Sequence, residues 1–301
     1  MLAFLEGAVI AAVLALTAMG LSIVFGVMRV VNVAHGEFFM LGAVLAWFVT
    51  YAIGGHPALG FVAALVIAPL LVSVIAAAAD TFILKHIKYD PDRTIVATIG
   101  LLYFFQQGTL MTFGPDARPV EAPFNHRLAL PWIENGETGL QMFWPWGLSI
   151  TSYKIFVIVA AVLVLMGLWA LITRTKIGLI MRATQQDSEM AQAFGIPVGR
   201  VYSLVFGLGA ALAALGAVLV VPIQQAHYLM GGEPLLLAFI VVIIGGLGSL
   251  PGTVFAAVLI GMSDGIISVF FSPMIAKIIA TLFVTMILIW RPQGLFGKVI
   301  R

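Results

Sequence analysis

Nine apolar runs, most of them long enough to cross a bilayer, dominate this sequence. A helix that crosses the hydrocarbon core needs about 20 mostly apolar residues. Charged residues make up only 9% of the chain, whereas an ordinary soluble domain has about 25%. The runs lie near residues 7–27, 36–54, 59–84, 94–113, 152–173, 201–222, 235–248, 252–271 and 275–290. They predict an all-α, polytopic membrane bundle of about eight or nine transmembrane helices, formed by a single domain over residues 1–301.

The seventh run, 235–248, is too short to cross the bilayer comfortably. Gly245, Gly246 and Gly248 break the chain at its end, and a proline follows them. Irregular backbone at membrane depth survives only where protein covers it or where it lines water. We therefore expect a half-helix or re-entrant segment here, with these glycines as candidate pathway residues.

Basic residues predict the orientation of the chain, because Lys and Arg favour cytoplasmic loops. If segment 174–200 is cytoplasmic, most of the 15 basic side chains fall on that side of the membrane. The exceptions are Arg118, Arg127, Lys154 and Lys277. This places the N-terminus outside and the C-terminus in the cytoplasm. The opening residues MLAFLEGAV carry no basic side chain, so we expect a retained span rather than a cleavable signal peptide.

One long segment, 114–151, joins two runs on the outer side. It contains five prolines, and Trp132, Trp144 and Trp146 suit the membrane–water interface. Loops of this length are usually functional. We expect a periplasmic loop that either contacts a partner or lies on the membrane surface as a lid.

A polar segment at 174–200 separates two apolar runs and has the pattern of a short helix over 184–195. Thr184 and Asp187 have the spacing of a capping box, and Gly195 provides a left-handed end. Asp187 and Glu189 place negative charge near the positive end of that helix.

Met190 and Phe194 lie four residues apart in this segment, so they share one face of the helix. This pattern predicts an apolar knob that a soluble partner can grip. A solvated loop helix without a partner is the alternative.

Asp264, Gln106 and Gln107 are polar side chains inside apolar runs. A charge at mid-bilayer costs roughly 2.5–3.5 kcal/mol on insertion scales, and such residues usually face a bundle interior. Asp264 is therefore either a pathway residue or a packing partner of Lys277 or of a helix terminus. Gln106 and Gln107 either line a polar route or bond a neighbouring helix.

The hexapeptide Asn32 to Glu37 joins the first two runs and is rich in polar groups. Asn32 or Gly36 can start the second helix, and Glu37 suits its positive end. A tight turn between helices explains this pattern, and a pathway role for Asn32, His35, Gly36 and Glu37 is the alternative.

Several activities are excluded by what the sequence lacks. The stretch GLFGK at 294–298 has neither the glycine spacing nor the hydroxyl residue of a P-loop, so if the protein uses ATP, another chain must bind the nucleotide. The five histidines are scattered and there is no cysteine, which argues against a metal site or thiol chemistry. No catalytic cluster or cofactor motif is present. The net charge of only +2 argues against nucleic acid as a partner.

Taken together, four segments resemble the permeases of branched-chain amino-acid ABC importers. They are GLSIVFGVMRVVNVAHGEFFMLGA (20–43), TKIGLIMRATQQDSEMAQAFGI (175–196), IIGGLGSLPGTVFAAVLIG (243–261) and RPQGLFG (291–297). Within the second, EMAQAFG approximates the wider ABC-permease pattern Glu-Ala-Ala-x-x-x-Gly, with Met190 replacing one Ala. The chain departs from the family at Leu237, where a Lys is common, and in the loop KHIKYDPDR.

The resemblance implies a transport subunit in a bacterial inner membrane, with no catalysis of its own. Its partners would be two cytoplasmic ABC ATPases, a second permease (related or identical) and a periplasmic or tethered binding protein. The ATPases would act through a coupling loop that contains Arg182, Asp187, Glu189, Met190, Ala191, Phe194 and Gly195. The implied cargo is a branched-chain or related amino acid. Alternatives are urea, short amides or aromatic compounds in the same machine, and a stand-alone secondary transporter.

Overall fold

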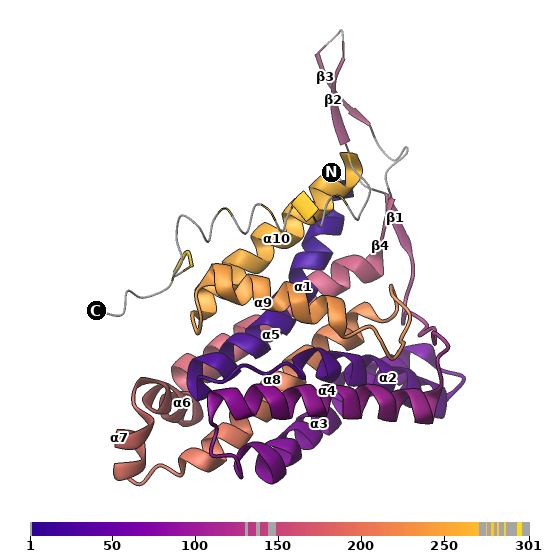
Figure 1. Ribbon diagram of the computed structural model, residues 1–301. Helices are drawn as coiled ribbons and strands as arrows, with labels where there is room; N and C mark the ends of the chain where they lie inside the picture. The colour runs from indigo at the N-terminus through magenta and orange to yellow at the C-terminus, as the bar shows by residue number, and fades with distance from the viewer. Residues whose placement is uncertain are drawn as a thin grey trace.

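A bundle of long apolar helices forms the protein, shown in Figure 1. The computed structural model describes residues 2–129, 132–136, 139–143, 149–270 and 294–296, together with positions 275, 278, 279, 282 and 286. The helices are α1 (Leu2–Met28), α2 (His35–Ile53), α3 (Pro57–Ala79), α4 (Pro91–Phe113), α5 (Ser152–Arg174), α6 (Lys176–Gln186), α7 (Ser188–Ala193), α8 (Val198–Val220), α9 (Gly232–Gly245) and α10 (Leu250–Phe270). A π-helical turn, η1 (Asp80–Leu84), extends α3.

Seven of the described helical segments are long and apolar enough to span a membrane: Ala3–Met28, His35–Ile53, Pro57–Leu84, Pro91–Phe113, Ser152–Arg174, Val198–Val220 and Leu250–Ser268. This confirms the all-α polytopic class. The predicted run 275–290 lies mostly outside the described residues. The seventh run is a short helix as predicted, but α9 begins at Gly232 and ends at Gly245.

Segment 114–151 contains strands, which the sequence analysis did not anticipate. β1 (Arg127–Ala129) pairs with β4 (Ser149–Thr151), and β2 (Trp132–Gly136) pairs with β3 (Gly139–Phe143), both antiparallel. The β2–β3 pair projects away from the helices in Figure 1. Trp144 and Trp146 lie outside the described residues.

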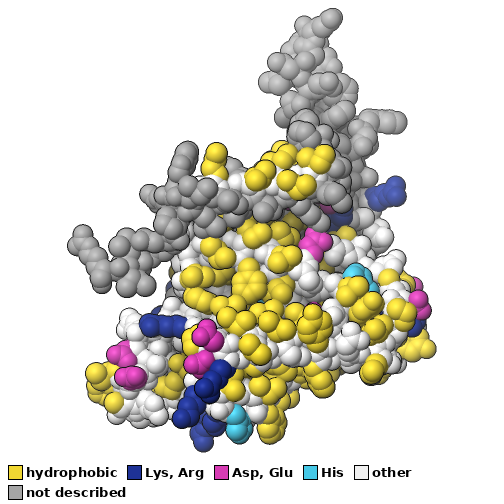
Figure 2. Space-filling model, viewed as in Figure 1, with side chains coloured by type: hydrophobic (Ala, Val, Ile, Leu, Met, Phe, Trp, Pro, Cys, Tyr) yellow, Lys and Arg dark blue, Asp and Glu magenta, His cyan; other side chains and the backbone are white. Residues whose placement is uncertain are grey.

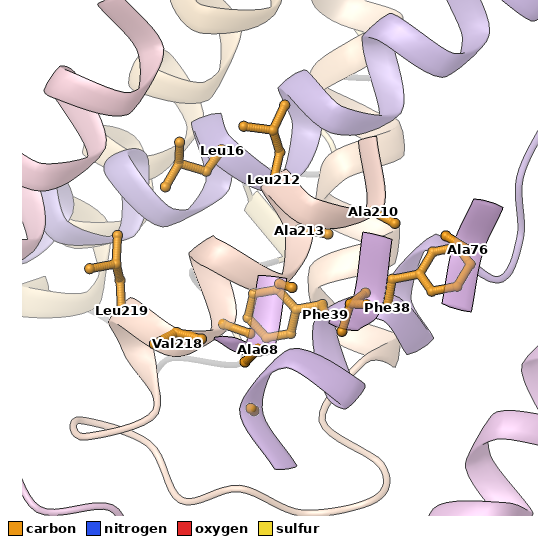
Figure 3. Packing of buried hydrophobic residues seen from close by; sticks show 14 of the residues in the cluster. Leu16, Phe38, Phe39, Ala68, Ala76, Ala210, Leu212, Ala213, Val218 and Leu219 are labelled. Carbon is orange, nitrogen blue, oxygen red and sulfur yellow. The ribbon is translucent and has the colours of Figure 1, made fainter. Parts of the chain in front are cut away.

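Aromatic side chains of α2 form the centre of the core. Phe38 and Phe39 are fully buried, and Figure 3 shows them among small residues of the neighbouring helices, such as Ala68 of α3 and Ala210 and Ala213 of α8. Alanines at these positions let α3 and α8 approach α2 closely enough to enclose the two rings. The sequence therefore stabilises this crossing by pairing large side chains on one helix with small ones on the others.

Glycines permit a second close crossing, between α1 and α8. A Cβ added at Gly20 would lie 2.3 Å from the Gly209 carbonyl oxygen, so the two backbones touch. Gly209, Ala213 and Ala217 lie four residues apart and are buried on α8, a spacing of small residues that permits close contact between helices.

The two ends of the bundle differ in charge. One end, called the α7 end below, carries α6, α7, the last turn of α1 and the turn 85–90. The basic side chains Arg29, Lys85, Lys88, Arg93, Arg174, Lys176, Arg182 and Arg200 all lie there. On the face seen in Figure 2, blue side chains gather at this end and yellow apolar ones cover the middle of the bundle. The opposite end, called the strand end, carries β1 and β4.

Candidate functional site

Two helices, not one, form the polar segment at the α7 end. The prediction that Thr184 caps a helix over 184–195 is wrong. It lies inside α6, where its hydroxyl donates to the Ile180 carbonyl at 2.9 Å. Asp187 is extended and caps α7, accepting from the Met190 N–H at 2.9 Å. The predicted capping box fails because the Asp187 carboxylate competes successfully for the free N–H groups at this break.

Helix α7 ends in a Schellman motif. Gly195 has a φ of +84°, its N–H donates to Gln192 O at 2.9 Å, and the Ile196 N–H donates to Ala191 O at 3.0 Å. The predicted left-handed end at Gly195 is confirmed. Capped at both ends, this six-residue helix keeps a fixed shape although it is too short to be stable alone.

The outward face of α7 carries the predicted apolar pair. The side chain of Phe194 is 81% exposed and that of Met190 is 54% exposed, whereas Ala191 is buried against the bundle. Glu189 is exposed in the first turn. We call Met190 and Phe194 the α7 knob. Two large apolar side chains held out at a polar end of a membrane protein are typical of a protein contact site.

Helix α6 fixes the knob to the bundle. The Arg182 guanidinium donates to Ile172 O at 2.8 Å and thereby caps the end of α5. The Gln185 side chain lies against the backbones of Gly26 in α1 and Gly248, and the Arg29 guanidinium donates to Gln185 O at 3.3 Å. Direct contacts through α6 therefore connect α7 to the end of α1.

The glycine-rich turn after α9 lies at this same end of the bundle. Gly245 ends α9 in close contact with Gly252, Gly246 caps the helix and Gly248 contacts Gly26. The Leu295 N–H donates to Ile244 O at 2.6 Å, so the last described residues of the chain pack back onto α9. These glycines therefore let α9, α10 and the end of α1 come into close contact. The sequence predicted the irregular backbone at membrane depth after this helix. In the structure it lies before α9, at residues 221–231, because the turn that follows α9 is at the end of the bundle.

The segment between α1 and α2 enters the bundle. His35 Nε2 lies 2.9 Å from the carbonyl oxygen of Thr17, near the middle of α1, so α2 begins deep among the helices. Asn32 Oδ1 accepts from the Ala34 N–H at 3.0 Å, and Thr98 Oγ1 of α4 accepts from the Val33 N–H at 3.2 Å. Side chains thus satisfy the irregular backbone, as membrane depth requires.

Three members of the motif in this segment are buried polar residues: Asn32, His35 and Glu37. Glu37 Oε2 and His35 Nδ1 have no hydrogen-bond partner among the described residues. Gly36 packs backbone to backbone on Gly231, before α9. A simple turn between helices would not need so many buried polar groups, because each one costs free energy unless it is paired.

A buried cluster around Asp80 was missed by the sequence analysis. The Ser203 hydroxyl donates to Asp80 Oδ2 at 2.5 Å, and the Tyr89 hydroxyl donates to the same oxygen at 3.4 Å. Burial and the neighbouring Asp80 carboxylate raise the pKa of Tyr89 above its usual value, so the phenol remains a neutral donor. The cluster ties η1 to the start of α8, which follows α7 directly. Ser203 is 123 residues away from Asp80, so no local pattern could have revealed this contact.

The remaining predicted pathway residues lie on outer helices. Gln106 is half-buried and Gln107 is exposed on α4, which packs only lightly against the rest of the bundle. Asp264 is half-buried in α10, near the close crossing of Gly261 and Gly265 with α1. α4 reaches the start of α2, since the ring of Phe105, next to Gln106, lies 5.7 Å from the ring of Phe38, next to Glu37. Within the described residues there is no group of acidic and histidine side chains able to hold a metal ion.

A comparison with protein families identifies the chain. The family described as "Branched-chain amino acid transport system / permease component" matches residues 3–290. The protein belongs to this family of transport permeases. Its membership agrees with the fold, because the match covers every described spanning helix.

Curated relatives of this family include three informative proteins. The permease BraD of Pseudomonas aeruginosa is 26% identical over 97% of this chain and 94% of its own length. LivH of Escherichia coli K12 has the same identity and coverage. LivM of that strain is 26% identical over 92% of this chain and 66% of its own length. All three are named permease proteins of high-affinity branched-chain amino acid transport systems. No solved structure matches the chain.

Proposed function

We propose that this protein is the membrane-spanning permease subunit of an ABC importer in a bacterial inner membrane. Its proposed cargo is leucine, isoleucine, valine or a related amino acid. Similarity to BraD and LivH over nearly the whole chain supports this class of cargo. The same machine carrying urea, short amides or aromatic compounds is the second candidate, because the chain departs from the family pattern at Leu237.

The α7 knob carries the proposal that separate ATPases drive the protein. The knob is exposed, rigidly capped and linked to α1 through α6. Two cytoplasmic ABC ATPases would bind Met190 and Phe194, with Glu189 at the rim, while Asp187, Ala191, Gly195 and Arg182 hold the helix in place. A partner shifts a conformational equilibrium only if it binds the two states differently. Because α7 contacts α6 and α8, a change in the shape of the bundle would move the α7 knob and so change how tightly the ATPases bind it.

The remaining partners follow from the division of labour in such importers. A second permease, identical or related, would complete the passage, and the existence of both LivH and LivM in one organism supports a pair. A periplasmic or tethered binding protein would deliver the cargo to the strand end. The bilayer surrounds the bundle, and the N-terminus lies outside. This subunit performs no catalysis and needs no cofactor.

Reconstitution of the whole complex tests this function. The permease would be co-expressed with neighbouring ATPase, permease and binding-protein genes, purified through a tag and placed in proteoliposomes. We expect ATP-dependent uptake of labelled leucine that vanadate inhibits and that disappears when the ATPases are omitted. Uptake of urea or benzoate but not leucine would favour the second candidate. Full uptake by this chain alone, driven by an ion gradient, would contradict the proposal.

A further inference from the structure

Two helices, α2 and α9, begin in the middle of the bundle and meet there. The start of α2 lies beside Thr17, near the middle of α1. The start of α9 has the same depth, because a Cβ added at Gly36 or at Gly231 would lie 2.3 Å from the carbonyl oxygen of the other residue. From this contact α2 runs to the strand end and α9 to the α7 end. The positive ends of two helix dipoles therefore meet near the middle of the membrane.

The two helix starts are alike in sequence as well. The order is His35-Gly36-Glu37 at α2 and Gly231-Gly232-Glu233 at α9, with an acidic residue in the first turn of each helix. Each start follows a long helix and a segment that turns back into the bundle, and the two run in opposite directions. Interrupted helices related in this inverted way are common where transporters hold their substrates.

The Glu37 carboxylate is an independent sign of a ligand. Its side chain is 2% exposed, and Oε2 has no hydrogen-bond partner in the part of the chain that the structure describes. Leu41, Phe48 and Tyr51 follow it at 4, 11 and 14 residues, and therefore lie on the same stripe of α2. Phe48 and Tyr51 are exposed at the far end of this stripe, whereas Val44, seven residues after Glu37, is buried and Phe113 of α4 packs against Phe48. Glu37 lies on the side of α2 away from Gly42, which packs on Ala214 of α8.

The start of α9 is open beside it. Gly232 is exposed, and a Cβ added there would meet no described atom within 4 Å. The preceding Gly231 is close to Glu37, because its added Cβ would lie 3.3 Å from the Glu37 nitrogen. A helix N-terminus that begins with two glycines, which favours carboxylates, therefore lies next to a buried carboxylate, which favours ammonium groups; the exposed Glu233 follows in the same turn of α9.

We propose that the N-termini of α2 and α9 form a subsite at mid-membrane depth for the zwitterionic head of an α-amino acid. The Glu37 carboxylate accepts hydrogen bonds from the ammonium group, and the first turn of α9 at Gly232 faces the carboxylate. The proposal rests on the transport function above and adds a place where the permease itself recognises its cargo. It also gives the motif around Gly36 a role, since only glycine lets the two helix starts meet so closely.

The natural absence of cysteine allows a direct test. Gly232→Cys would be prepared in the assembled complex, with ATPases and second permease, in lipid nanodiscs. It would be treated with two thiol reagents of similar size, methanethiosulfonate ethylammonium and methanethiosulfonate ethylsulfonate. Both should react, because the site is hydrated, and the cationic one should react faster by roughly tenfold because of the nearby carboxylate. Val66→Cys, exposed in the middle of α3, is the matched lipid-facing control and should react with neither.

Two further measurements assign the charge and the ligand. In Gly232→Cys/Glu37→Gln the ratio of the two labelling rates should fall, and the preference that remains is the contribution of the exposed Glu233 next to the thiol. In Gly232→Cys alone, millimolar L-leucine should slow labelling several-fold, whereas isoamylamine and 4-methylpentanoate, which each lack one charge, should not. This second measurement keeps Glu37 intact, so it remains decisive if the double variant fails to fold.

Several results would overturn the subsite. They are a Gly232→Cys thiol as unreactive as Val66→Cys in both resting and vanadate-trapped complexes, a rate ratio that Glu37→Gln leaves unchanged, or equal protection by the amine alone. None of them affects ATP-dependent uptake by the unmodified complex. Failure of the transport function would instead appear as absent ATP-dependent uptake in the cysteine-free protein.

Discussion

At the scale of single residues, Phe194 is the side chain on which coupling to the ATPases depends most. Burying a phenylalanine in a partner contributes about 2–3 kcal/mol, so its loss weakens binding roughly 30- to 140-fold. Phe194→Asp should therefore abolish most ATP-dependent uptake in proteoliposomes and release the ATPases during purification. The fold should survive, because this side chain is 81% exposed and supports no other contact in the core.

His86→Asp is the matched control for Phe194→Asp. His86 is exposed at the same α7 end, in the turn between η1 and α4, and lies outside the α7 knob. The same charge placed there should leave uptake and ATPase retention nearly unchanged. If Phe194→Asp kept wild-type uptake and wild-type ATPase stimulation, the knob would not be the docking point.

The Asp80 cluster makes a separate prediction about stability. A hydrogen bond to a charged group contributes about 1.5–3 kcal/mol, and a buried acceptor left unpaired adds to the loss. Ser203→Ala removes the donor at 2.5 Å, whereas Tyr89→Phe removes one at 3.4 Å. We expect Ser203→Ala to lower the Tm of the detergent-solubilised protein by more than Tyr89→Phe does. The reverse order would show that Ser203 is not the main partner of Asp80.

At the scale of elements, the crossing of α1 and α8 depends on two glycines. A Cβ at position 209 would lie 2.8 Å from the Gly20 carbonyl oxygen and 2.6 Å from Val24 Cγ2. A larger side chain cannot be accommodated without separating the two helices, since one of these atoms belongs to the backbone. Gly209→Leu should yield aggregated protein in size-exclusion chromatography of detergent extracts.

Gly167→Leu tests the same change where nothing is crowded. Gly167 lies on α5, and a Cβ there would meet no described atom within 4 Å. Because leucine has the better helix propensity by nearly 1 kcal/mol, Gly167→Leu should be tolerated. Monodisperse, thermally stable Gly209→Leu protein would show that the crossing is looser than the distances indicate.

The sequence predicted the elements unequally, and the reason is physical. Runs such as 94–113 and 152–173 predicted α4 and α5 to within three residues, because lipid leaves a long apolar segment no other stable conformation. Run 235–248 likewise predicted α9 to within three residues, but the depth of its start could not be predicted, because that depth is set by the contact of Gly231 with Gly36. The α7 knob could be predicted, because Met190 and Phe194 lie four residues apart in the sequence. The Asp80 cluster could not, because Ser203 is 123 residues away.

At the scale of the whole molecule, the distribution of charge predicts how the protein sits in its membrane. The basic side chains of the described residues lie mainly at the α7 end, although their positions are spread along the whole sequence. Lys and Arg are retained on the cytoplasmic side during insertion, so the α7 end should face the cytoplasm and the strand end the outside. The short α9 does not disturb this assignment, because α8 and α10 both run from the α7 end toward the strand end.

Single cysteines in the naturally cysteine-free chain measure this orientation. Asp116→Cys, in the exposed segment after α4, should react with a membrane-impermeant maleimide in intact spheroplasts. His86→Cys, in the exposed turn before α4, should react only after the membrane is permeabilised. The two positions lie at opposite ends of one helix, so each is the control for the other. Labelling of His86→Cys in intact spheroplasts, with protection of Asp116→Cys, would invert the molecule and place the α7 knob beyond the reach of any cytoplasmic ATPase.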